Sequence, residues 1–320
     1  RIANELQFFL DNDELPVITF PDWETLPYDV FSPLPELVSQ RLLTLHRVRE
    51  LQHGIVIAPV ATLMQRILPA DFLDAHSLLL QVGEQLDFDA FRRKLERAGY
   101  NNVSQVMSHG EFAVRGSLID LFPMGSEQPL RIDLFDNEID SIRAFDPESQ
   151  RTEEKIQQFS MLPAREFPVD ETAVTRFRSA WREYFEGDPQ RSLIYRDVSE
   201  GQMPGGIEYY LPLFFERTAT LFDYLPRSTL IAHDSGFSRE AGEFFSQVGE
   251  RYEQRRHDIE RPLLAPAELY LDEEALASKV AAFARVIHHP HKLEHVESFE
   301  TRLLPPLSLQ GKATDPAASL

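Results

Sequence analysis

Residues 111–151 constrain the fold more than any other part of the chain, because their side chains alternate with the two-residue period of antiparallel β-strands. We expect a strand over residues 112–122 and a second strand over residues 130–135. Proline, glycine and serine are concentrated at residues 123–126, which predicts a turn between the two strands. This part of the chain should therefore form an antiparallel sheet.

The alternation also predicts which side chains of the second strand point away from the core. Arg131, Asp133 and Phe135 share one face, opposite to the aliphatic residues between them. With a turn of the expected length, Arg115 lies nearly opposite Phe135 and joins Arg131 in one exposed patch. Arginine and aromatic residues are enriched at binding hot spots. The alternative is that the arginines are solvated edge charges and that Phe135 is an isolated exposed apolar residue.

The rest of the chain shows the alternation of strands and helices that is typical of a parallel α/β fold. Short apolar runs at residues 16–20, 54–59 and 229–233 are typical of buried strands, and helical spacing lies between and after them. We therefore expect a parallel α/β domain that is interrupted by an α+β module. The expected divisions are residues 1–76, the inserted module at 77–162, the second α/β part at 163–290, and a linker or tail at 291–320.

Composition excludes several classes of function. The 32 basic and 52 acidic residues give a net charge of −20, which opposes binding to nucleic acid. The chain has no cysteine and no apolar run near 18 residues, so we expect no disulfide, no membrane span and a cytoplasmic location. It opens on Arg1 within a helical pattern, from which we expect an upstream βα unit.

Several strings resemble known families. The inserted module is similar to a module shared by the repair protein UvrB and the bacterial transcription-repair coupling factors, the Mfd family, through RGSLIDLFP at 115–123, RIDLFDNEID at 131–140 and FDP at 145–147. Further strings resemble the coupling factors more closely, namely DWETLPYD at 22–29, PVATLMQR at 59–66, LFPMGSE at 121–127 and GIEYY at 206–210. In both families the module docks UvrA. The resemblance implies that Arg115, Arg131 and Phe135 are the UvrA-contacting residues.

The same resemblance implies a P-loop ATPase plan, of the RecA-like type, in degenerate form. A glycine-rich phosphate-binding string followed by Lys and Ser or Thr is absent from residues 1–290, and one could lie upstream of Arg1. Asp234 and Ser235 occupy the positions where UvrB carries an acidic pair, so the catalytic glutamate is replaced by serine. We therefore expect no hydrolysis, and we expect Asp234 to cap a helix that begins near Ser238.

The only other candidate for chemistry is a cluster of histidines near the end of the second α/β part. It lacks cysteines and a second group of ligands, so we expect neither a metal site nor a cofactor. Its members are His288, His289, His291 and His295.

These observations predict a non-catalytic module that recruits UvrA and links stalled RNA polymerase to nucleotide excision repair. Its partners would be UvrA and other domains of the same full-length protein, whose translocase activity would belong to downstream domains. We expect Arg131→Ala or Phe135→Ala to weaken UvrA binding by about 2 kcal/mol with little change in melting temperature. The alternative is a UvrB-like helicase fragment that binds ATP and DNA.

Overall fold

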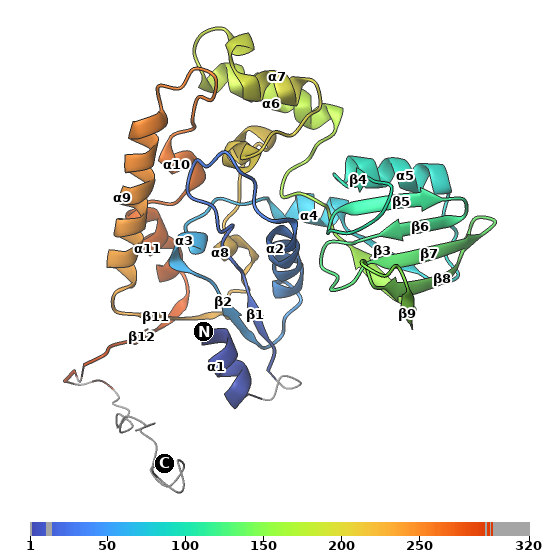
Figure 1. The fold of residues 1–320 in the computed structure, drawn as a ribbon. Coiled ribbons are helices and arrows are strands. Elements are labelled where there is room, and N and C mark those ends of the chain that lie inside the picture. Colours follow the sequence, from blue (N-terminus) through green and yellow to red (C-terminus); the bar gives the residue numbers. More distant parts are fainter. Residues whose placement is uncertain (1, 11–14, 292, 295, 297–320) are drawn as a thin grey trace, which may run out of the picture.

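The chain forms an α/β body and a β-rich lobe that extends from one side of it (Figure 1). The computed structural model describes residues 2–10, 15–291, 293, 294 and 296. The first and last parts of the chain build the body, and the middle part builds the lobe. The structure is mixed α/β, with parallel strand pairs in the body and a mainly antiparallel sheet in the lobe.

The first part of the body alternates helices and strands, as expected. The elements are α1 (Ile2–Phe9), β1 (Val17–Thr19), α2 (Pro35–Val48), β2 (Ile55–Ile57), α3 (Val60–Leu63) and α4 (Ala70–His76). Strands β1 and β2 pair in parallel, with Val17 opposite Ile55. Pro35 begins α2 because its fixed φ suits the first helical position.

The lobe contains one helix and a six-stranded sheet. Its elements are β3 (Leu78–Gln81), α5 (Phe88–Arg97), β4 (Asn101–Asn102), β5 (Glu111–Arg115), β6 (Leu118–Leu121), β7 (Leu130–Phe135), β8 (Glu138–Phe145), β9 (Thr152–Ile156) and β10 (Gln158–Met161). The sheet has the order β4-β5-β6-β7-β8-β9 and is antiparallel except for the β4–β5 pair. Helix α5 packs on one face of this sheet through Phe91 and Leu95.

The strand expected over residues 112–122 is two strands, so that prediction was wrong. Gly116 and Ser117 form a tight turn that folds β6 back onto β5, with Arg115 opposite Leu118. Gly116 has a φ of 65°, a left-handed conformation that glycine adopts without steric cost. The hairpin inserts β6 between β5 and β7, which changes the neighbours of every side chain on the sheet.

The last part of the body is mainly helical. Its elements are α6 (Glu171–Tyr184), the 3₁₀ helix η1 (Pro189–Arg191), α7 (Leu193–Ser199), the 3₁₀ helix η2 (Ile207–Phe214), α8 (Leu221–Tyr224), β11 (Leu230–Asp234), α9 (Phe237–Arg255), α10 (Pro266–Leu269), α11 (Glu273–Ala281) and β12 (Ala284–His288). Asp170 caps α6 by accepting a hydrogen bond from the Ala173 amide at 2.8 Å. Strand β12 was not predicted, and it pairs in parallel with β11. None of the described helices has the length and apolar content needed to cross a membrane.

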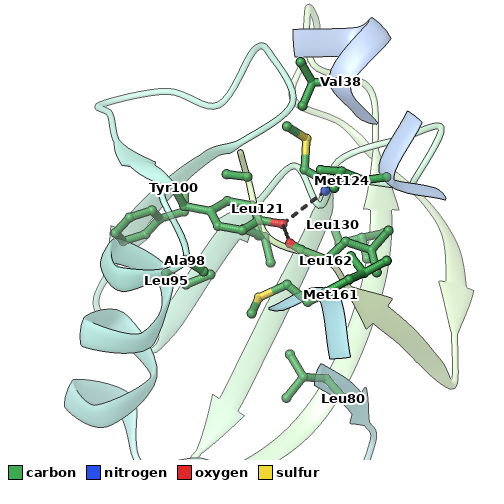
Figure 2. Packing of buried hydrophobic residues seen from close by; sticks show 14 of the residues in the cluster. Val38, Leu80, Leu95, Ala98, Tyr100, Leu121, Met124, Leu130, Met161 and Leu162 are labelled. Carbon is green, nitrogen blue, oxygen red and sulfur yellow. Dashed lines mark hydrogen bonds between the residues drawn. The ribbon is translucent and has the colours of Figure 1, made fainter. Parts of the chain in front are cut away.

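Buried contacts hold the lobe to the body. Strands β3 and β10 lie side by side where the chain enters and leaves the lobe. Inside the lobe the Tyr100 hydroxyl donates to the Leu162 carbonyl at 2.7 Å and accepts from the Met124 amide at 3.1 Å (Figure 2). The next amide, that of Gly125, donates to Ser39 Oγ on α2 at 2.8 Å. The sheet is therefore fixed relative to the body through α2.

The segment that returns from the lobe is held by a buried ion pair. Arg41 Nε of α2 lies 2.6 Å from Glu166 Oε1, and both side chains are almost completely buried. The Trp23 indole donates to the other carboxylate oxygen at 3.0 Å. Trp23 belongs to one of the strings that carry the family resemblance, and its role in the structure is to hold this joint.

Candidate partner-binding surface on the antiparallel sheet

The lobe sheet has an outer face, which we define as the face opposite α5. Residues that pair directly across an antiparallel sheet share a face, so the register identifies the side chains on it. They are Ala113, Arg115, Leu118, Asp120, Arg131, Asp133, Phe135, Glu138, Ser141, Arg143 and Lys155. The intervening aliphatic residues belong to the core beneath α5.

One end of the outer face is covered and the other is open. Val106, from the loop between β4 and β5, forms a small core with Ala113, Phe122 and Phe145. That core lies at the end of the sheet away from the two hairpin turns, β5–β6 and β7–β8. The turn end is therefore open to a partner, as is the β9 edge of the same face, where Lys155 is exposed.

Phe135 lies at this open end. It is the last residue of β7, and its side chain is 73% exposed. The turn that follows begins with Asp136, which has a left-handed φ of 54°. A rigid aromatic ring held outward at a tight turn can enter a pocket on another protein with little loss of conformational entropy.

Arg115 lies on the same face as Phe135 but is not its cross-strand neighbour. Leu118 of β6 lies between Arg115 and β7, and it pairs with Asp133. The predicted pairing of Arg115 with Phe135 was therefore wrong, because it required β5 and β7 to be adjacent. The exposed Arg115 side chain donates from Nη2 to the Ser104 carbonyl at 3.0 Å, which directs it along the sheet edge.

Arg131 is engaged within the lobe. Its Nε and Nη2 atoms donate to the two carboxylate oxygens of Asp120 at 2.7 and 2.9 Å. The guanidinium also lies 4.9 Å from the centre of the Phe145 ring. The hydrogen bonds that Arg131 donates to Asp120 raise the pKa of Arg131 above its ordinary value. The two guanidinium donors that could bind a carboxylate of a partner in bidentate fashion are thus already bound to Asp120.

This pair changes the expectation for Arg131→Ala. Asp120 is 2% exposed, and Arg131 supplies the only hydrogen bonds to its carboxylate among the described residues. A substitution that removes the guanidinium leaves a buried carboxylate without a partner, which destabilises a fold strongly. The structure therefore contradicts the expectation of a nearly unchanged melting temperature for this variant.

Sequence reasoning missed three polar residues on the outer face: Asp120, Ser141 and Arg143. Asp120 and Arg143 each lie between two buried aliphatic residues, so the two-residue alternation could have placed both. Ser141 follows the exposed Asp140 at a β-bulge, where the alternation is broken. What the alternation could not supply was the register. Arg131 of β7 lies opposite Asp120 on the neighbouring strand β6 and opposite Arg143 on the other neighbouring strand, β8.

The position expected for a degenerate ATPase pair lies at the end of β11. Asp234 Oδ1 is 2.6 Å from His288 Nδ1, and the Ser235 amide donates to the His288 carbonyl at 2.9 Å. Helix α9 begins after Gly236 and has no side-chain cap. The expectation that Asp234 caps this helix was therefore wrong, because the unpredicted strand β12 brings His288 beside it.

The predicted histidine cluster extends beyond the described residues at His295. Within the described part, no group of three or more histidine, aspartate or glutamate side chains is arranged to hold a metal ion. His288 is paired with Asp234, and both side chains are exposed.

Comparison with known proteins identifies the lobe. The sequence model of the UvrB interaction domain family matches residues 78–167, which span the lobe and the segment that leaves it. The lobe therefore belongs to the UvrB interaction domain family.

The whole chain is similar to transcription-repair-coupling factors. It is 44% identical to the Escherichia coli protein over 325 aligned residues, which cover 100% of this chain and 28% of that protein. It is 43% identical to the Haemophilus influenzae protein, over 95% of this chain and 27% of that protein. The Bacillus subtilis protein is 28% identical over 90% of this chain and 26% of its own length. The chain thus matches the N-terminal region of this family and spans about a quarter of its relatives' length.

Proposed function

We propose that this chain is the UvrA-recruiting part of a transcription-repair-coupling factor and has no catalytic activity of its own. Its role would be to link a stalled RNA polymerase to nucleotide excision repair in the cytoplasm. The observation that carries the proposal is the exposed Phe135 at the open end of a UvrB interaction domain. The name shared by the relatives, which denotes coupling of transcription to repair, agrees with it.

In this proposal the outer face of the lobe contacts UvrA. Phe135 enters an apolar pocket, and Arg115 and Arg131 lie in the contact area on the same face. Arg115 is free to swing toward a partner because its single hydrogen bond is to an exposed loop carbonyl. Arg131 contributes by holding the surface in shape, since its own fork is engaged by Asp120.

The body would act as a scaffold derived from a RecA-like P-loop ATPase. The parallel pairs β1–β2 and β11–β12 support this origin. The Asp234 carboxylate is hydrogen-bonded to His288. Ser235 stands at the position of the catalytic glutamate, and its hydroxyl cannot polarise the attacking water as a carboxylate does. Together with the net charge of −20, these features disfavour the alternative of a helicase fragment that binds ATP and DNA. Other domains of the same protein would be further partners.

A titration of purified UvrA with this chain tests the proposal. Phe135→Ala should weaken binding about 30-fold, which corresponds to about 2 kcal/mol. Its melting midpoint should stay within about 1 °C of wild type, because surface substitutions of this kind change stability little. Phe31→Ala is a matched control, since Phe31 is 69% exposed but lies on the body. Wild-type affinity in the Phe135 variant, or no binding by the wild-type chain, would contradict the proposal.

A further inference from the structure

A row of charged side chains crosses the outer face of the lobe sheet. The row runs across the four consecutive strands β6 to β9. In register, Asp120 lies opposite Arg131, Arg131 lies opposite Arg143, and Arg143 lies opposite Lys155. Residues in direct register on adjacent strands lie about 5 Å apart at their backbones. One carboxylate is thus followed by three cations, in a chain whose net charge is −20.

The charges in this row are not equally available. Asp120 neutralises Arg131 through two hydrogen bonds, so that pair presents little net charge to a partner. Arg143 and Lys155 have no ion-pair partner anywhere in the described parts of the chain. Like charges directly opposite each other on a sheet are destabilising. The presence of two adjacent cations despite this cost indicates that they have a role in binding.

Two polar atoms beside these cations also lack partners. Arg143 Nε and Ser141 Oγ are both buried, and neither makes a hydrogen bond within the described residues. Ser141 is 8% exposed and lies two residues before Arg143, so both side chains project from the same face of β8. Buried polar atoms are nearly always paired in native proteins, with protein groups or with ordered water, so a water or a group of a docked partner is expected beside each of these two atoms.

We propose that Arg143, with Ser141 beside it and Lys155 on the next strand, forms a carboxylate-binding site for an acidic segment of the docking protein. The inference deepens the proposed function and rests on it, with UvrA as the partner. Arg143 would donate from its guanidinium, and Ser141 would donate its hydroxyl hydrogen to the same carboxylate. Lys155 would bind a second carboxylate about 5 Å away, since strand spacing sets that distance.

The proposal gives Arg131 a positioning role. By pairing with Asp120 it lets Arg143 lie directly opposite a second arginine without full electrostatic repulsion. Its guanidinium also lies 4.9 Å from the centre of the Phe145 ring, a second contact that holds the side chain in place. Arg131 would therefore affect binding through Arg143 and not by gripping the partner itself.

Titration of UvrA with variants of the full chain at low and high salt tests the assignment. Arg143→Ala should weaken binding about 10- to 30-fold at low salt, and Lys155→Ala about 3-fold. The affinity of the Arg143 variant should also depend less on salt than that of wild type, because screening acts on exposed charges. Arg143→Gln should behave like Arg143→Ala, and both should melt at or above the wild-type midpoint, since a like-charge contact is removed.

Arg93→Ala is the matched control. Arg93 is an exposed arginine without an ion-pair partner in the described residues, and it lies on α5, on the opposite face of the lobe. Its removal should change affinity less than about 2-fold. If wild type binds and Phe135→Ala does not, while Arg143→Ala binds like wild type, the carboxylate site is refuted and the proposed function stands. If wild type itself fails to bind UvrA, both are refuted.

Discussion

Arg131→Ala is expected to destabilise the lobe, because it removes the only hydrogen-bond partner that the buried Asp120 carboxylate has among the described residues. Asp120 is 2% exposed and accepts two hydrogen bonds from Arg131. Removing one member of a buried ion pair costs about 3–5 kcal/mol. The Arg131 side chain is 20% exposed, so water can partly replace it, and we expect the lower end of that range, about 3 kcal/mol.

Thermal and urea denaturation measure this effect. Each kcal/mol moves the melting midpoint by about 2–4 °C in proteins of 150–250 residues, so we expect a fall of about 6 °C or more. The double variant Asp120→Ala, Arg131→Ala should recover much of the loss, since replacing both partners of a buried pair is often nearly neutral. A midpoint within about 1 °C of wild type for Arg131→Ala would refute the reasoning. So would a double variant whose destabilisation equals the sum of the two single substitutions.

Two further predictions concern the body. Gly206 has a φ of 72°, and a Cβ added there would collide with the Asp29 carbonyl, so Gly206→Ala should lower the free energy of unfolding by more than about 2 kcal/mol. Gly201 has a φ of 79° but open space around it, so Gly201→Ala should lower that free energy by only about 1 kcal/mol. Equal losses for the two variants in urea denaturation would contradict this prediction. Burial raises the pKa of Glu208, so its contribution to stability is complete below its ordinary pKa of 4.5 and is lost as pH rises through the folded pKa. Glu208→Gln should therefore melt higher than wild type at pH 8, by a margin that shrinks toward pH 4; a margin independent of pH would rule this out.

The sequence was sufficient to place the sheet and the outward direction of its key residues. The alternation from Leu130 to Phe135 predicts the face that Arg131 and Phe135 occupy, and the burial of β7 confirms it. Alternation carries this information because side-chain direction depends only on the strand itself. Helix caps are equally local, since Asp170 and Asp272 each accept a hydrogen bond from the amide three residues later.

Contacts between strands could not be derived in the same way. A two-residue turn at Gly116 and Ser117 decides whether β5 or β6 lies beside β7, and the continuous alternation around it concealed the turn. A glycine in an otherwise regular strand pattern was the available signal. The neighbour of Asp234 was also non-local, because His288 lies 54 residues further along the chain and reaches it through the pairing of β12 with β11.

The Asp120–Arg131 pair shows why binding data alone would misassign this surface. Loss of Arg131 should weaken partner binding whether the residue touches the partner or only supports Arg143, since it lies between Asp120 and Arg143 in the same row. Stability separates the two roles. A residue that only contacts a partner leaves the free fold unchanged when truncated, as expected for Phe135, whereas a residue that neutralises a buried carboxylate does not. The affinity and the melting midpoint of each variant must therefore be measured together, and within this row Arg143 and Lys155, unlike Arg131, should combine weakened, less salt-dependent binding with an undiminished midpoint.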